Sequence, residues 1–313
     1  MNKIKEIFVI FLLLIFCINS SNSTIKDSII GTVGDKPVTS SDLTNEMKIL
    51  LITNGENFSE VDKKKLQELA VQSITRRLIK KIEIEKYNSN NFNEEDVMNE
   101  IRNIANKLNI NVDNLKNIFK SYKVNFLYLI DHIETELKWN GLIFNLYKNQ
   151  ISVNISEIHD QLKIIQNQDF IEEYLIYEIQ IELLDQEKLQ KKINEIKNEI
   201  QINGFEKTAI KYSKSTSALK GGRLGWFKET ELSEKIKEIL GNINVGSVAE
   251  PLRKPEGLIF LKLADKKKVE QKFNLEETKN ILLKAEKNKK LKMYSLSHYN
   301  KLTQLTLINY NLQ

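Results

Sequence analysis

Apolar residues recur every three or four positions along much of the first half of the chain, which is the spacing of one face of a helix. The longest stripe runs from about residue 60 to 87, with lysines and glutamates between its apolar members. Shorter stripes with the same spacing cover 43–52, 94–108 and 124–147. Each stripe can bury one face against its neighbours. We therefore predict an all-helical body over residues 40–166.

A β-favouring pattern precedes these stripes. Residues 29–39 read IIGTVGDKPVT, in which two β-favouring pieces flank Gly34-Asp35-Lys36. This pattern predicts a hairpin. Because an isolated hairpin is only marginally stable in water, we expect it to pair with a further strand.

The pattern changes again near Phe170. The β-favouring run YLIYEIQIELL begins at Tyr174. Segments with helical or strand spacing follow at 186–202, 205–212, 231–240 and 257–263. With a glycine-rich stretch between the second and third of these, the order predicts a compact α+β domain over residues 169–268.

The last part of the chain, residues 269–313, returns to helical spacing. One long lysine-rich stripe covers 275–302, and a short apolar tail runs from Leu305 to Tyr310. We expect this helix and a terminal strand to pack on the N-terminal domain, residues 24–168, where the strand would pair with the hairpin.

Residues 1–23 have the layout of a secretory signal peptide. Lys3 and Lys5 precede an unbroken apolar run over 7–18, and serines follow it. The run is shorter than the roughly 20 residues that span a bilayer. We therefore predict cleavage of the leader and a periplasmic location. The alternative is an uncleaved leader that anchors the chain in the membrane.

Cysteine and histidine usage limits the chemistry of the exported chain. Cys17 is the only cysteine and lies inside the leader, so no disulfide, thiolate nucleophile or cysteine metal site is expected. A cysteine-free exported protein fits a bacterial envelope better than a eukaryotic secretory route. The three histidines, His132, His159 and His298, lack the i, i+4 spacing of a helical metal site, so we expect no bound metal.

Composition and motifs exclude further classes of protein. Apolar residues make up 41% of the chain and charged residues 28%, which indicates a globular protein with a core. The formal net charge of +5 is too small and too dispersed to indicate a nucleic-acid partner. The sequence has no P-loop, dinucleotide fingerprint or nucleophile elbow, so we expect no small-molecule cofactor.

The most distinctive stretch is Ser217–Phe227, SALKGGRLGWF, where three glycines lie within five residues. Such a density indicates backbone conformations or close approaches that other residues tolerate poorly. Around it lie a Tyr-Ser pair at 212–213, a Val-Gly-Ser-Val run at 245–248 with Pro251, and Gly257 at the start of an apolar strand. Together these features resemble the parvulin-type peptidyl-prolyl isomerases.

The layout of the whole chain is similar to that of the SurA-type periplasmic chaperones. These have a signal peptide, an N-terminal region with a strand and helices, parvulin domains, and a C-terminal helix and strand that rejoin the N-terminal region. The resemblance implies a mainly α N- and C-terminal chaperone body plus an α+β parvulin-like domain. This chain has one such domain, whereas SurA proteins often have two.

The resemblance also implies where a catalytic cluster would lie. The family's first-strand histidine position is Glu178, its cysteine or aspartate position is Ser215, and its last-strand histidine position is Ile259. Because all three differ, we expect no catalytic residue and a degenerate site. The resemblance places a substrate-binding surface at Leu224, Trp226, Leu232 and Ile236. Packing in the core is the alternative role of the three aliphatic residues.

Three functions follow from this resemblance and from the leader. The first is a chaperone that binds unfolded or extended polypeptides, with outer-membrane protein precursors as the expected clients. The alternative is an active parvulin-type peptidyl-prolyl isomerase with a rearranged site, so the sequence leaves the enzymatic question open. The third is a membrane-anchored assembly factor, which requires that the leader stay uncleaved.

Overall fold

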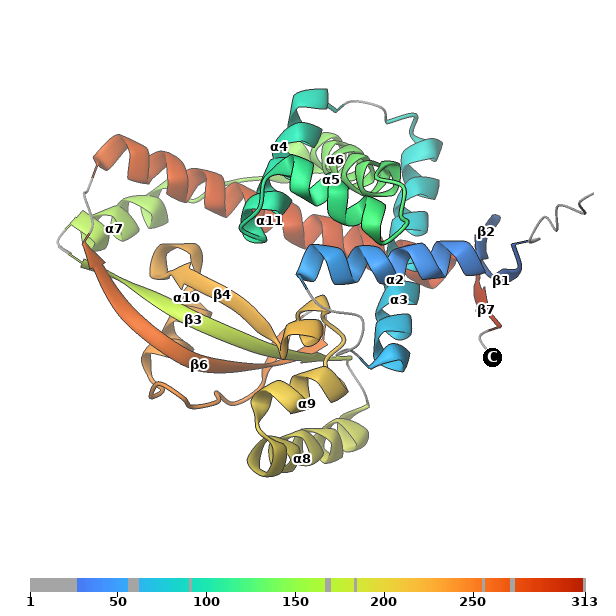
Figure 1. The fold of residues 1–313 in the computed structure, drawn as a ribbon. Helices are drawn as coiled ribbons and strands as arrows, with labels where there is room; N and C mark the ends of the chain where they lie inside the picture. Colours follow the sequence, from blue (N-terminus) through green and yellow to red (C-terminus); the bar gives the residue numbers. More distant parts are fainter. Residues whose placement is uncertain are drawn as a thin grey trace, which may run out of the picture.

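The computed structural model describes residues 27–55, 62–89, 92–166, 170–182, 185–254, 257–270 and 274–311. The signal peptide expected at 1–23 lies outside these residues. The described chain has a mainly helical body and an α+β domain, which confirms the predicted fold class (Figure 1). Within these segments, every helix is too short or too polar to cross a membrane.

The body is built from helices whose apolar faces meet. Their bounds are α2 (Ser40–Asn54), α3 (Lys63–Lys86), α4 (Glu94–Lys107), α5 (Val112–Ser121), α6 (Leu127–Tyr147), α7 (Ile155–Gln166) and α11 (Leu275–Leu305). Helix α2 begins with a capping box, in which the Asp42 N–H donates to Thr39 Oγ1 and the Thr39 N–H donates to the Asp42 carboxylate. It ends at Gly55, whose φ of 69° is the left-handed conformation that glycine tolerates best.

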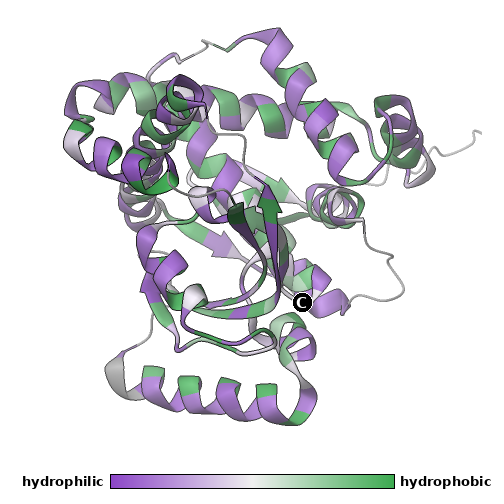
Figure 2. Cartoon of the chain, turned by 90° about the vertical axis from the view of Figure 1, so that its left-hand side faces the viewer, coloured by the Kyte–Doolittle hydropathy of each residue, from purple (hydrophilic) through white to green (hydrophobic). Residues whose placement is uncertain are grey.

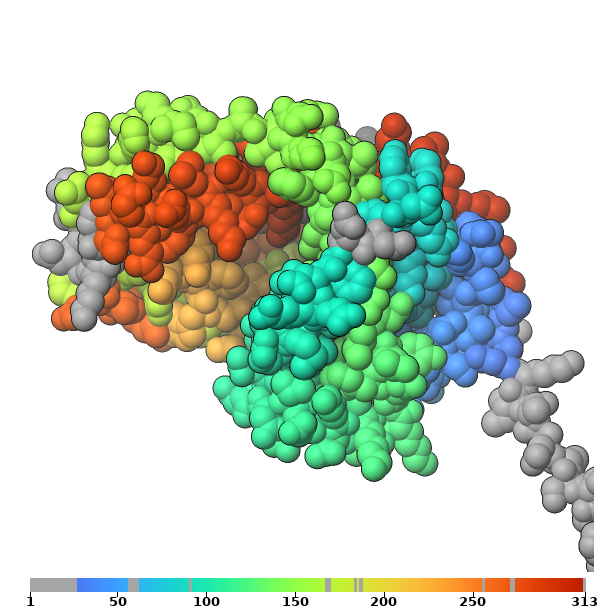
Figure 3. Space-filling model, turned by 90° about the horizontal axis from the view of Figure 1, so that it is seen from above, coloured from blue at the N-terminus to red at the C-terminus, as the bar shows by residue number. Residues whose placement is uncertain are grey.

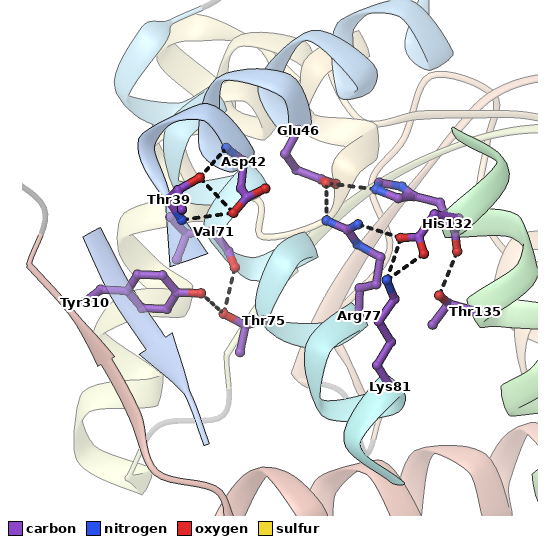
Figure 4. Close-up of polar contacts among 11 residues, drawn as sticks. Thr39, Asp42, Glu46, Val71, Thr75, Arg77, Lys81, His132, Thr135 and Tyr310 are labelled. Atoms are coloured by element: carbon purple, nitrogen blue, oxygen red, sulfur yellow. Dashed lines mark hydrogen bonds and ion pairs between the residues drawn. The ribbon is translucent and has the colours of Figure 1, made fainter. Parts of the chain in front are cut away.

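A small sheet joins the two ends of the described chain. Strands β1 (Ile29–Val33) and β2 (Lys36–Thr39) form an antiparallel hairpin, and β7 (Ile308–Tyr310) pairs with the other edge of β1. The C-terminal tail thus gives the hairpin its third strand. The hydroxyls of Tyr310 and Thr75 lie 2.8 Å apart and tie this sheet to α3 (Figure 4).

Buried side chains hold the body helices together. One cluster lies between α2, α3 and the small sheet and includes Leu51 and Leu66; another lies between α2, α4, α5 and α6 and includes Phe119. Trp139 of α6 is fully buried and donates its indole N–H to Ser295 Oγ of α11 at 2.8 Å. Apolar and polar residues alternate along the helices, as amphipathic packing requires (Figure 2).

Helix α11 connects several parts of the body. Its His298 ring lies between α3 and α6, with Nε2 2.9 Å from Glu83 Oε1 and Nδ1 2.8 Å from the Tyr147 hydroxyl. Nearer its beginning, Leu282 packs against the apolar face of α7. Helices α7 and α11 therefore run side by side (Figure 3).

The α+β domain is formed around a four-stranded antiparallel sheet of order β4-β3-β6-β5. Its elements are β3 (Phe170–Ile181), α8 (Gln186–Asn203), α9 (Phe205–Tyr212), the 3-10 helix η2 (Thr216–Lys220), β4 (Arg223–Lys228), the 3-10 helix η3 (Glu229–Glu231), α10 (Glu234–Gly241), β5 (Leu252–Lys254) and β6 (Gly257–Glu270). Helices α8 and α9 cover one face of the sheet and α10 packs on the other (Figure 1).

Strand β6 extends beyond the apolar run from which the sequence analysis predicts it. The run ends at Leu263, but the strand continues through three lysines to Glu270 and so passes residue 268, where we placed the domain boundary. Pairing with β3 explains the extension: Lys266 lies 3.0 Å from a carboxylate oxygen of Glu172, and Lys267 makes the matching pair with Glu173. Cross-strand pairing here overrides the low β propensity of lysine.

The domain contacts the body through η2. Leu219 is 7% exposed and belongs to the buried cluster that contains Leu66 and Leu69 of α3. Beside it, Lys214 Nζ lies 3.6 Å from Glu68 Oε2 of α3. The domain is therefore joined to the body by an apolar contact and an ion pair, in addition to the chain connections.

Candidate functional site

The two family histidine positions lie on the same face of the sheet. In β3, Ile176 packs on the α10 side and Ile179 on the α8 side, so alternation places Glu178 on the α10 side. Glu178 is opposite Leu261 in register, and Gln180 is opposite Ile259. Ile259 and Leu261 both pack on the α10 side. The structure thus brings the substituted positions Glu178 and Ile259 close together on one surface.

A chain of hydrogen bonds fixes the Glu178 carboxylate. The Ser217 hydroxyl lies 3.1 Å from Glu178 Oε1 and 3.0 Å from Ser215 Oγ. Ser215 also accepts the Ser217 N–H, which caps the start of η2. Glu178 and Ser215, which we selected from sequence, are therefore connected through Ser217. We had noted Ser217 only as part of the glycine-rich motif.

The glycines explain how this segment lies so close to β3. The Glu178 N–H donates to the Gly222 carbonyl at 2.7 Å. A Cβ at Gly222 would lie 2.3 Å from the Glu178 carbonyl oxygen, and a Cβ at Gly257 would lie 2.0 Å from the Ile181 carbonyl oxygen. Both glycines also have positive φ, so side chains there are excluded by contact and by conformation.

The predicted apolar surface is only partly assembled. Leu232 and Ile236 pack against the cluster that contains Ile259, together with Phe227 of β4, which the prediction did not include. Leu224 is 40% exposed and lies outside this cluster. The part of the predicted surface that the structure unites with Ile259 is therefore the pair Leu232 and Ile236.

Trp226 lies on the opposite face of the sheet from this pair. This placement follows from strand alternation, because the neighbouring Phe227 points to the α10 side. The Trp226 ring centroid lies 4.5 Å from Lys267 Nζ, at the exposed part of β6. The strand geometry therefore separates Trp226 from Ile236, and a role for Trp226 in binding stays a prediction.

The α10 side of the sheet faces the helical body. Helix α10 and the upper end of β4 lie beneath α11 in Figure 1, whereas α8 and α9 lie on the far side. Seen from above, the molecular surface is hollowed between α11, the gold segment of the α+β domain and the teal helices α4 and α5 (Figure 3). The surface that carries Ile236 thus belongs to a domain that borders this hollow.

A second hollow, of about 610 Å³, lies in the body between the hairpin, α3 and α6. Its lining residues are Lys36, Pro37, Asp42, Ile74, Arg77, Leu78, Lys81, Glu85, Asn125, Leu127, Tyr128 and Asp131. Its apolar part includes Leu127, which is 63% exposed. Five of its charged residues pair with one another: Lys36 with Glu85, and both Arg77 and Lys81 with Asp131. The sixth, Asp42, accepts hydrogen bonds from Thr39. The hollow therefore offers apolar side chains surrounded mostly by paired charges.

Behind this hollow, the buried Glu46 links three helices (Figure 4). Its Oε2 lies 3.0 Å from Arg77 Nη2 and 3.0 Å from His132 Nε2. Burial by itself would raise the pKa of Glu46, but the contacts with His132 and Arg77 outweigh it and lower that pKa. Burial would likewise raise the pKa of Asp131, but the contact with Lys81 outweighs that effect, so this pKa is also lowered. These charges hold α2, α3 and α6 together.

Potential metal-ligating side chains do not gather in the described part of the chain. No group of three or more histidine, cysteine, aspartate or glutamate side chains there could hold an ion. Two histidines instead pair with buried carboxylates, His132 with Glu46 and His298 with Glu83. Their roles are structural contacts between helices.

Comparison with known proteins identifies the domain. A family model described as the PPIC-type PPIASE domain (Rotamase) matches residues 178–265. The curated protein "Chaperone SurA" of Idiomarina loihiensis is 26% identical over 83% of this chain and 62% of its own length. "Chaperone SurA" of Photorhabdus laumondii is 32% identical over 53% of this chain and 40% of its own length. The chain spans about three fifths of the length of the first curated relatives that it matches.

Solved structures with some likeness to this chain include both types of protein. A SurA-like chaperone of Campylobacter jejuni covers 91% of this chain and 99% of its own, at 15% identity and a TM-score of 0.34. The PrsA peptidylprolyl isomerase of Bacillus anthracis covers 75% of this chain and 95% of its own, at 18% identity and a TM-score of 0.33. The sequence matches, rather than these structures, show that the chain is similar to the SurA chaperones over most of its length and has one parvulin domain of the PpiC type.

Proposed function

We propose that the protein is a periplasmic chaperone that binds unfolded polypeptides, among them precursors of outer-membrane proteins. The observation that carries the proposal is the contrast on the α10 side of the sheet. There, the family's polar cluster is replaced while apolar residues remain: Ile259 takes a histidine position, and Leu232 and Ile236 pack against the same buried cluster. Such a surface suits binding of apolar segments more than chemistry.

Physical chemistry gives the reason to expect that the replacements weaken catalysis. Rotation about a peptide bond meets a barrier of roughly 18–20 kcal/mol. An enzyme lowers it with preorganised polar groups that favour the twisted amide over the ground state. Ile259 can neither donate nor accept a hydrogen bond, and Glu178 already accepts one from Ser217. We therefore propose that the domain binds polypeptide with little or no isomerisation.

The position of the domain supports holding of extended segments. The α10 side borders the hollow between α11, α4 and α5 (Figure 3), so a segment bound there would also contact the body. Exposed apolar side chains on the body, such as Phe144 at 49% and Met293 at 61%, add further contact area for non-specific binding. Weak contacts spread over a large surface suit recognition of many sequences.

Suppression of aggregation tests this function. An outer-membrane β-barrel unfolded in urea is diluted into buffer with and without the purified protein, and light scattering is followed. We expect scattering to fall as the protein approaches a stoichiometric ratio to the client, whereas an equal mass of an unrelated soluble protein leaves it unchanged. Undiminished scattering at a several-fold molar excess would contradict the proposal.

An active peptidyl-prolyl isomerase remains the second candidate, and one observation favours it. The Ser215–Ser217–Glu178 chain places polar groups, held by hydrogen bonds, at the position of the family's cluster. A preorganised polar chain is what electrostatic catalysis needs. Catalysed isomerisation of a proline peptide would establish this activity.

The periplasmic location rests on the leader and on the SurA relatives. Export and cleavage would leave a chain that begins near Thr24. Mass spectrometry of the protein purified from its own cells measures this terminus. Recovery of the intact residues 1–23 in a membrane fraction would instead support the anchored assembly factor.

A further inference from the structure

Glu178 is a partly buried carboxylate without a cationic partner in the described part of the chain. Its hydrogen bond comes from the Ser217 hydroxyl, and no lysine, arginine or histidine among the described residues forms an ion pair with it. Among the cations on the elements around it, Lys214 pairs with Glu68 and Lys262 with Glu206. Lys220 of η2 and Arg223 of β4 form no ion pair with any described residue. No ion pair with a described residue therefore neutralises the negative charge of Glu178.

An apolar surface lies beside this charge. Glu178 shares its sheet face with Ile259, and Leu232 and Ile236 pack against the buried cluster to which Ile259 belongs. Apolar neighbours exclude water and so strengthen any charge interaction at this position. A carboxylate held in such surroundings without a partner favours a ligand that brings a positive charge.

We propose that Glu178 makes this surface select polypeptide segments in which a lysine or arginine adjoins a proline or another apolar residue. The apolar side chain would contact the partly exposed Ile236, and the cation would pair with the Glu178 carboxylate that Ser217 holds in place. This specificity rests on the proposed polypeptide binding and adds to it the chemistry of the preferred segment.

A purely structural role for Glu178 makes a different prediction. If its carboxylate served only to hold the Ser215–Ser217 segment, replacing it would lower the melting temperature of the domain but would not change which peptides bind. Charge preference in binding therefore separates the two roles, and stability alone does not.

The test uses the full-length processed protein and three fluorescent peptides of the type Phe-X-Pro-Phe, in which X is lysine, glutamine or glutamate. Fluorescence anisotropy gives each dissociation constant in low salt. We expect the lysine peptide to bind on the order of fivefold more tightly than the glutamine peptide, as one screened charge pair allows, and the glutamate peptide to bind most weakly. Added salt should reduce these differences.

Two variants and one control assign the preference to Glu178. Glu178→Gln should bring the three dissociation constants together, and Ser217→Ala should reduce the preference because the carboxylate loses its hydrogen bond. Glu238→Gln removes the same charge from an exposed position on α10 and should leave the preference unchanged. Circular dichroism confirms that each variant is folded.

The outcomes separate this proposal from the chaperone function. Equal binding of the lysine and glutamate peptides by the natural protein overturns it, as does a preference that survives in folded Glu178→Gln. Failure of all three peptides to bind overturns it as well. In each case the aggregation measurement still decides the chaperone function, because that measurement does not depend on the residue before proline.

Discussion

Leu219 of the parvulin domain lies in the same buried cluster as Leu66 of helix α3 in the body. Leu219 is 7% exposed and Leu66 is 1% exposed, so the two units share one apolar core at this contact. The contact belongs to η2, whose first turn also holds Ser217 at the Glu178 carboxylate. The position of the candidate site relative to the body therefore depends on this small helix.

Truncation at this contact should weaken the molecule. Leu219→Ala leaves a cavity in a shared core, and we expect a loss of about 2–4 kcal/mol in the free energy of unfolding, measured by urea denaturation. Leu224→Ala is the matched control, because Leu224 is 40% exposed in the same domain and should cost no more than about 0.5 kcal/mol. Equal losses in the two variants would contradict the shared core.

Glu46 should make the stability of the body depend on acidity. Its folded-state pKa lies below its ordinary value of 4.5, because the contacts with His132 and Arg77 outweigh burial. The unfolded chain then binds more protons than the folded chain in this range. The stabilisation from Glu46 is therefore present above pH 4.5 and is lost as the pH falls through the lower folded-state value.

Urea denaturation at a series of pH values from 6 downward measures this dependence. We expect the free energy of unfolding to fall below about pH 4.5, and Glu46→Gln to make that fall shallower. Glu238→Gln, at an exposed position of α10, should leave the slope unchanged. An unaltered slope in Glu46→Gln would show that this buried carboxylate does not contribute to acid sensitivity.

Gly222 should tolerate no side chain. A Cβ there would lie 2.3 Å from the Glu178 carbonyl oxygen, and the φ of 85° is itself unfavourable for other residues. We expect Gly222→Ala to cost more than about 2 kcal/mol of stability. Gly241→Ala is the control, since a Cβ at this helical position meets nothing within 4 Å, and it should be neutral or slightly stabilising. Thermal melting of both variants provides the comparison.

The fold was predictable where local pattern and tertiary structure agree. The predicted stripe over residues 60–87 matches α3, because one apolar face at helical spacing is also the face that α2 and α6 cover. The extension of β6 past Leu263 was not predictable, because its lysines favour a strand only when Glu172 and Glu173 lie opposite them. Long-range pairing, rather than local propensity, sets that boundary.

The candidate site was predictable in its positions but not in its geometry. Glu178 and Ile259 could be selected from the motif, and the sheet places them on one face. The resemblance predicts Trp226 on one binding surface with Leu232 and Ile236, whereas alternation along β4 places it on the opposite face from Phe227. The role of Leu219 was invisible, because its partners lie on helices far away in the sequence.

The rate of proline isomerisation most directly tests whether this domain binds polypeptide without catalysing its isomerisation. A protease-coupled assay on a proline peptide compares the natural protein with buffer and with the double variant Glu178→His, Ile259→His. We predict that the natural protein leaves the rate at its buffer value, and that any acceleration occurs only in the double variant. A clear acceleration by the natural protein would contradict this account and would show that the Ser215–Ser217–Glu178 chain is catalytically competent.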